Sequence, residues 1–172
     1  MKTTLFAFLL LLGGFSAALA QEPPKPAAPK IYNPQANAQQ DIKNAVTKAA
    51  REGKHVLVQI GGNWCSWCIR FHQLVHSDTT LNRLLHDNYE MLLVNYSPEN
   101  KNEETLAQLG YPQRFGFPVF VVLDGQGNRL HTQNSAYLEE GKGHSPKQVA
   151  EFFQQWSPKA LDPKSYLPKK NQ

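Results

Sequence analysis

The only two cysteines of the chain, Cys65 and Cys68, stand two residues apart and closely follow an apolar run, HVLVQIG, at residues 55–61. The run has the composition of a buried strand, and residues 68–76, CIRFHQLVH, have the periodicity of a helix. The pair therefore lies where a strand passes into a helix. A disulfide between these cysteines would close a very short loop and restrict the unfolded chain little, so it would be a poor structural staple. We therefore expect the value of the pair to be chemical.

Strand and helix patterns alternate on both sides of the cysteines. The first two predicted strands are joined through helices, which favours a parallel pair, and the last two form a hairpin. The chain is thus expected to be an α/β protein with a mixed central sheet flanked by helices. Apolar periodicity and turn residues predict helices at 37–53, 68–76, 78–88, 102–110 and 145–156, and strands at 55–61, at 89–96 and, around a turn at 124–128, within 117–132.

The first twenty residues have the pattern of a targeting segment. Lys2 precedes an apolar run, and Ala18-Leu19-Ala20 is a small-residue cleavage pattern. Residues 1–20 are therefore predicted to be a signal peptide cleaved near Ala20, with an uncleaved membrane anchor as the alternative. We expect an exported protein, either periplasmic or secreted, and paired cysteines are normally oxidised in those places.

The remaining chain divides by composition into three parts. Residues 21–35 contain five prolines and are interpreted as a linker, and residues 36–157 as one domain. Residues 158–172 are interpreted as a basic, proline-containing tail with little structure. The formal charge is +4, but the basic residues form no block beyond Lys169-Lys170, so no nucleic-acid partner is expected.

A cysteine pair at the start of a helix has a predictable chemistry. Cys65 would lie beside the unpaired N–H groups of the first turn, where the helix dipole favours its thiolate and lowers its pKa. A thiolate is the species that attacks a disulfide, and Cys68, one turn later, is close enough to resolve the product. We assign attack to Cys65 and resolution to Cys68, with their disulfide as the redox group and no other cofactor.

From about Ala36 to Ser157 the sequence resembles the thioredoxin superfamily. The strand HVLVQI leads into NWCSWC, and the later segment GFPVFVVLD matches the family segment that carries a cis-proline opposite the cysteines. Locally, GGNWCSWC resembles small exported thioredoxin-like proteins with a W-C-x-W-C motif. The resemblance implies a thioredoxin-like fold and a protein-disulfide oxidoreductase.

The resemblance also implies which residues meet a substrate. Pro118 would be the cis-proline, and its backbone, with that of Phe117, would pair with an extended substrate segment beside Cys65. Trp64 is expected to pack beside the site, and Trp67 to be exposed at the helix tip, where it can face a partner. The implied partners are protein thiols and disulfides and a membrane protein that donates electrons. The protein is expected to be a monomer.

Two positions depart from thioredoxin itself. Six residues before the first cysteine, thioredoxin has a buried acid thought to relay a proton to the second cysteine. This chain has Gln59, which can hydrogen-bond but cannot titrate. Between the cysteines, Ser66-Trp67 replaces Gly-Pro, so Gln59 and Ser66 are expected to tune the couple. No histidine precedes Cys68, and the span to Pro118 has no room for an inserted helical domain. We therefore expect a reductase-like role or general thiol–disulfide exchange.

Two other functions fit parts of the same pattern. A copper- or zinc-binding metallochaperone could use Cys65, Cys68 and His72. However, Cys65 and His76 would be about 16 Å apart along one helix, so the four side chains of Cys65, Cys68, His72 and His76 could not all reach one ion. We therefore expect no metal site. The second alternative is a non-catalytic binding module that keeps the fold as a scaffold, and the presence of both cysteines disfavours it.

Overall fold

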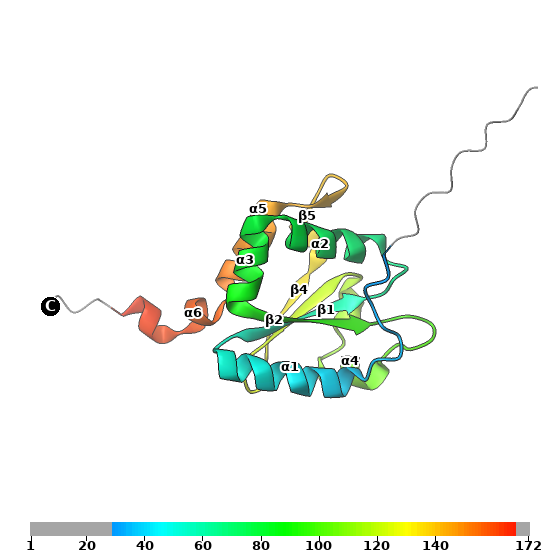
Figure 1. Cartoon of the computed structure of the whole chain (residues 1–172), viewed down its shortest axis with the longest axis horizontal. Helices are drawn as coiled ribbons and strands as arrows, with labels where there is room; N and C mark the ends of the chain where they lie inside the picture. The colour runs from blue at the N-terminus through cyan, green and yellow to red at the C-terminus, as the bar shows by residue number, and fades with distance from the viewer. Residues whose placement is uncertain (1–28, 168–172) are drawn as a thin grey trace, which may run out of the picture.

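The computed structural model describes residues 29–167, which are built around a four-stranded sheet (Figure 1). The strands lie in the order β2-β1-β3-β4. β1 and β2 are parallel, and β3 is antiparallel to both β1 and β4. The mixed sheet predicted from the sequence is therefore confirmed. Its strands are β1 (His55–Gly61), β2 (Tyr89–Asn95), β3 (Val119–Leu123) and β4 (Arg129–Asn134).

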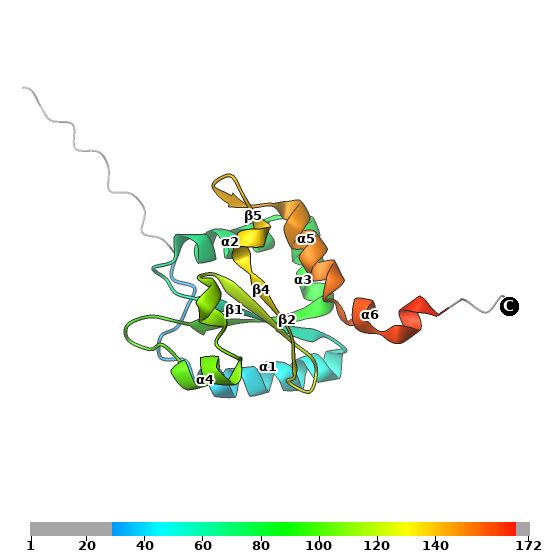
Figure 2. The same cartoon turned by 180° about the vertical axis from the view of Figure 1, so that it is seen from behind.

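Helices cover both faces of this sheet, as Figures 1 and 2 show from opposite sides. On one face lie α1 (Ala38–Glu52) and α4 (Glu103–Gln108). On the other lie α2 (Ser66–Ser77), α3 (Thr79–Asn88) and α5 (Pro146–Gln155). Within residues 29–167, no helix is both long and apolar enough to cross a membrane.

Successive side chains of β1 alternate between two apolar cores, one on each face of the sheet. Val56 and Ile60 belong to the cluster that includes α1, whereas Leu57 belongs to the cluster formed with α2, α3 and α5. Successive side chains of a strand point to opposite faces of its sheet. Gln59 and Gly61 therefore lie on the same face as Leu57, and the strand brings them under the helix that follows the cysteines.

Local signals set the helix ends where the sequence predicted them. α1 ends at Gly53, which adopts the left-handed conformation with φ of 65°. α3 begins after Asp78, whose carboxylate accepts hydrogen bonds from the N–H groups of Thr80 and Leu81 at 2.9 Å each. Both ends depend on neighbouring residues alone, which is why the sequence predicts them well.

Several short elements were not predicted. The expectation of little structure after Ser157 is wrong for residues 158–166, where a short helix and a 3-10 turn form. Ser157 and Asp162 each act as an N-cap directly before a proline, a combination that favours helical turns. The predicted signal peptide, residues 1–20, lies outside the described residues, as do 21–28 and 168–172. The additional elements are η1 (Pro112–Phe115), η2 (Ser135–Leu138), β5 (Glu139–Glu140), β6 (Gly143–His144), α6 (Pro158–Leu161) and η3 (Pro163–Tyr166).

Candidate active site

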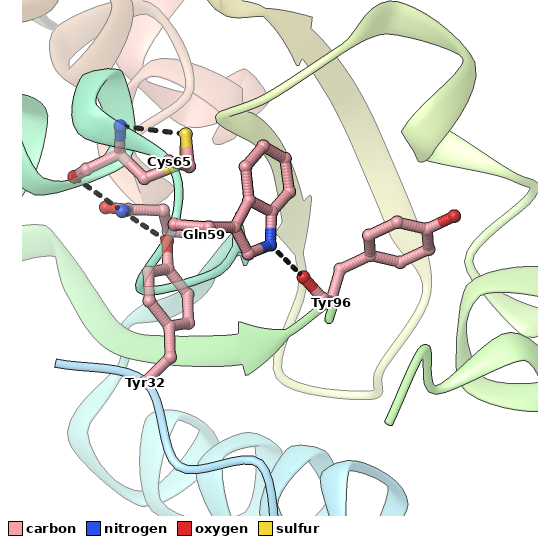
Figure 3. Close-up of a disulfide and its surroundings, with 6 residues drawn as sticks. Tyr32, Gln59, Cys65 and Tyr96 are labelled. Atoms are coloured by element: carbon pink, nitrogen blue, oxygen red, sulfur yellow. Dashed lines mark hydrogen bonds between the residues drawn. A yellow bond between two sulfur atoms is a disulfide. The ribbon is translucent and has the colours of Figure 1, made fainter. Parts of the chain in front are cut away.

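Cys65 and Cys68 form a disulfide at the junction of β1 and α2 (Figure 3). Cys65 is the N-cap of α2, and its Sγ accepts a hydrogen bond from the backbone N–H of Cys68 at 3.1 Å. A first-turn amide directed at this sulfur is the arrangement that stabilises a thiolate there once the pair is reduced. Cys65 is 5% exposed and Cys68 is fully buried, so an incoming disulfide would meet Cys65 first. The assignment of attack and resolution stays a prediction.

The Phe117–Pro118 peptide bond is cis, as the resemblance implied. Pro118 is buried, and the partly buried ring of Phe117 packs against the cluster that contains both cysteines. The fold thus brings these residues next to the disulfide from a distant part of the chain. Their pairing with a substrate backbone stays a prediction.

Trp64 is 57% exposed but is fixed in place beside the disulfide. Its indole Nε1 donates a hydrogen bond to the backbone oxygen of Tyr96 at 2.7 Å (Figure 3). Its ring meets that of Phe117 edge-on, with centroids 5.5 Å apart. Gly62 leaves room for this contact, because a Cβ there would lie only 2.7 Å from the Tyr96 oxygen. Trp64 therefore presents a rigid apolar surface at the mouth of the site.

Trp67 is half-buried, which corrects the expectation that the helix tip would expose it. Its ring meets His144 edge-on at 5.4 Å, and the guanidinium of Arg70 lies over it at 5.4 Å. The sequence did not predict the short hairpin of β5 and β6 that carries His144 across this side of α2. Ser66, by contrast, is exposed between the cysteines, and its tuning role stays a prediction.

Gln59 is fully buried beneath the disulfide, where its amide makes two hydrogen bonds. Its Nε2 donates to the backbone oxygen of Cys68 at 3.1 Å and to the hydroxyl of Tyr32 at 2.6 Å (Figure 3). A backbone carbonyl can only accept, so the atom of Gln59 that faces it must be the NH₂ group. The orientation of the amide is thereby fixed, and the Tyr32 oxygen must be an acceptor.

Tyr32 is the site residue that the sequence reasoning missed. It falls in the proline-rich stretch 21–35, which was interpreted as a linker, yet it is only 4% exposed and packs against both cysteines. Burial raises the pKa of its hydroxyl above the ordinary value, and the hydrogen bond from Gln59 offsets this in part. An aromatic residue between prolines was the one sequence signal that this segment could pack against the domain.

Asn63 explains why residues near Tyr32 dock although they contain no regular structure. Its Oδ1 accepts hydrogen bonds from the N–H groups of Ile31 and Tyr32 at 2.9 Å each, and its Nδ2 donates to the backbone carbonyl oxygen of Tyr32 at 2.8 Å. One side chain thus binds the segment as a neighbouring strand would. The linker interpretation is corrected for Ile31 and Tyr32, because these long-range bonds outweigh the local proline signal.

The histidines of α2 do not complete a metal site with the cysteines. The rings of His72 and His76 lie 4.2 Å apart between centroids, and burial and the neighbouring His76 lower the pKa of His72. Among residues 29–167, no group of three or more histidine, cysteine or acidic side chains is placed to hold a metal ion. The arrangement therefore offers no support for the metallochaperone alternative.

A family model described as thioredoxin-like matches residues 37–125, just over half of the chain. The chain belongs to this family. Within a thioredoxin-like protein, a close cysteine pair at the start of α2 supports thiol–disulfide chemistry in general. No curated protein matches the sequence.

Comparison with solved structures bears on the fold. The thioredoxin-like chain is similar to a disulphide isomerase from Xylella fastidiosa Temecula1, with 23% identity and a TM-score of 0.67 over 75% of this chain and 98% of that one. It is also similar to a thioredoxin from Thermus thermophilus, with 21% identity and a TM-score of 0.49 over 66% of this chain and 81% of that one. The first likeness confirms the predicted fold class.

Proposed function

We propose that this protein is a thiol–disulfide oxidoreductase that acts on exported proteins through the Cys65–Cys68 couple, as a reductase or in general exchange. The observation that carries the proposal is the Cys65 sulfur at the N-cap of α2, hydrogen-bonded to the Cys68 N–H. Membership of the thioredoxin-like family supports the same chemistry. Phe117 packs against the cluster that contains both cysteines, which supports the proposal that the backbone of Phe117 and Pro118 pairs with an extended polypeptide there.

In the reducing direction, the reduced pair gives two electrons to a substrate disulfide. The Cys65 thiolate attacks one substrate sulfur, a mixed disulfide forms, and the other substrate sulfur leaves as a thiolate that takes a proton. Cys68 then loses its proton to solvent and attacks the Cys65 sulfur. The bond from Cys65 to the substrate breaks, and the Cys65–Cys68 disulfide forms. The second substrate sulfur also leaves as a thiolate and takes a proton. The substrate thus gains the two electrons that the pair loses and two protons, which match the one from Cys68 and the one that Cys65 released when it ionised.

The remaining parts of the proposal rest on the sequence. The W-C-x-W-C motif and the predicted signal peptide support a place among small exported thioredoxin-like proteins, in the periplasm or outside the cell. We propose that the protein works as a monomer, needs no cofactor beyond its own disulfide and receives electrons from a membrane protein. Exposed Trp64 and the neighbouring Phe117 would supply the apolar surface for substrate, with the uncovered part of Trp67 beside them.

Insulin reduction tests the activity. The mature protein with dithiothreitol should speed the reduction of insulin disulfides, and Cys65→Ser should abolish this effect because no thiolate remains at the N-cap. Ser77→Ala, which changes an exposed hydroxyl at the other end of α2, is the control and should keep full activity. Normal turnover by Cys65→Ser would refute Cys65 as the nucleophile.

The reduction potential of the couple tests the direction of electron flow. A value near that of thioredoxin, about −270 mV, supports a reductase that a membrane carrier keeps reduced. A value near that of the strongest oxidants, about −120 mV, would reverse the proposed direction. Equilibration with glutathione or dithiothreitol buffers gives this potential without knowledge of the natural partner.

A further inference from the structure

We propose that the Tyr32 hydroxyl, held by the Gln59 amide, donates a hydrogen bond to the Cys68 thiolate and so prepares Cys68 to resolve the mixed disulfide. The inference rests on the proposed function, because it assigns a role within the same couple. The hydroxyl is a neutral donor, so it stabilises the Cys68 thiolate without taking up the proton, which still leaves to solvent, and Gln59 is the positioning residue.

The first observation is that the Tyr32 hydroxyl and the Cys68 sulfur border the same small space. Gly61 faces α2, and a Cβ placed on it would overlap the Cys68 Sγ and lie 2.8 Å from the Tyr32 hydroxyl. The absence of a side chain at Gly61 therefore lets the two atoms approach one another. Tyr32 and both cysteines also belong to one buried cluster.

The second observation is that the Tyr32 proton is free to donate. Because the Cys68 carbonyl fixes the Gln59 amide, the Tyr32 oxygen accepts from Nε2, and its own O–H must point elsewhere. Within residues 29–167 this hydroxyl donates no hydrogen bond, and the buried Oε1 of Gln59 has no partner either. A buried hydroxyl without an acceptor is costly, and the sulfur across the Gly61 space becomes a strong acceptor when it is a thiolate.

The third observation concerns the titratable groups near Cys68: Arg70 and His144 lie against Trp67, whereas Tyr32 lies in the buried cluster with the cysteines. Besides the cysteines, Tyr32 is the only titratable member of the buried cluster, whose other side chains are Ile31, Trp67, Leu93 and Phe117. On α2 itself, His72 lies one turn after Cys68, and on β1 Gln59 cannot titrate. Burial keeps the Tyr32 hydroxyl protonated over the pH range in which thiols ionise, so it remains a donor throughout.

The test follows the two thiols of the reduced protein separately. Mixed with the disulfide reagent DTNB in a stopped-flow instrument, Cys65 attacks first and releases one equivalent of thionitrobenzoate. Cys68 then attacks the Cys65 mixed disulfide and releases the second equivalent. The rate of the second phase against pH reports the ionisation of Cys68. Any accessible thiol reacts with DTNB, so this readout does not depend on a natural substrate.

Tyr32→Phe removes only the hydroxyl. We expect the pH midpoint of its second phase to rise by about one unit, with a second phase about tenfold slower near neutral pH and an unchanged first phase. Tyr89→Phe is the matched control, because it removes another buried hydroxyl, bonded to the Phe153 oxygen at 2.7 Å outside the site, and should leave both phases unchanged.

Each outcome decides the proposal. A second-phase pH profile of Tyr32→Phe that superimposes on the wild type overturns it, while the wild-type reaction still supports a working couple. A wild-type protein that releases only one equivalent overturns the proposed function and this inference together. If Tyr32→Phe does not fold, Gln59→Met decides. This variant keeps the Tyr32 ring but releases its hydroxyl, so a raised midpoint supports the proposal and an unchanged one overturns it.

Discussion

At the scale of single residues, the candidate site depends on close approaches that only glycine allows. Gly61 is the last residue of β1 and Gly62 follows it, and each leaves room for a different partner. Gly61 makes space for the Cys68 sulfur and the Tyr32 hydroxyl, and Gly62 for the bond between Trp64 and the Tyr96 oxygen. The residue pair GG is therefore as much a part of the site as the cysteines that follow it.

The first prediction concerns Gly61. Gly61→Ala should lower the free energy of unfolding of the oxidised protein by about 1–3 kcal/mol, because the new methyl overlaps the Cys68 sulfur and crowds Tyr32. Denaturant unfolding measures this loss. Gly143→Ala is the control, since a Cβ there meets no atom within 4 Å. Equal stability of the two variants would show that the space at Gly61 is not filled as described.

At the scale of elements, the segment before α1 is attached by side chains instead of a strand pairing. Asn63 makes three hydrogen bonds to the backbone of Ile31 and Tyr32, and Asn100 Nδ2 adds one to the Pro34 oxygen at 2.9 Å. These bonds hold Tyr32 against the disulfide. Residues 31–34 are thus a structural part of the domain, although they form no helix or strand.

The second prediction concerns this attachment. Asn63→Ala should free the segment and raise the rate of chymotrypsin cleavage after Tyr32 by about tenfold or more, because three hydrogen bonds of about 1 kcal/mol each are lost. Mass spectrometry of the digest identifies the cut. Asn88→Ala, which loses one local hydrogen bond to the Leu84 oxygen on α3, is the control and should be cleaved there at the wild-type rate. An unchanged rate in Asn63→Ala would mean that other contacts hold the segment.

At the scale of the whole molecule, the two apolar cores position α2 on the sheet, and the β5–β6 hairpin packs over the start of this helix. His144 of β6 is buried between Trp67 and Phe71, whose rings it meets edge-on at 5.4 and 5.2 Å. Neither of its ring nitrogens has a partner among the described residues. Burial, with a smaller contribution from Arg70, lowers the pKa of His144 from 6.5 to about 4.

The third prediction is a loss of stability in acid. The unfolded chain takes up a proton at His144 below about pH 6.5, whereas the folded protein does so only near pH 4, so the unfolded state gains stability as pH falls through this window. Between pH 7 and pH 4 the wild type should lose about 3 kcal/mol more free energy of unfolding than His144→Phe. Urea unfolding across this range measures the difference. His86→Phe, at an exposed position, is the control and should follow the wild type.

The sequence by itself determined the order of the longer helices and strands, the mixed sheet and the place of the cysteine pair. These depend on local periodicity and on caps such as Gly53 and Asp78, which neighbouring residues decide. Only the tertiary structure decided what surrounds the pair. Tyr32 reaches Gln59 across 27 positions, and His144 covers Trp67 from a hairpin without a clear pattern. Such contacts depend on side chains that meet only after the sheet has formed, so no local pattern of residues identifies the two partners of each contact.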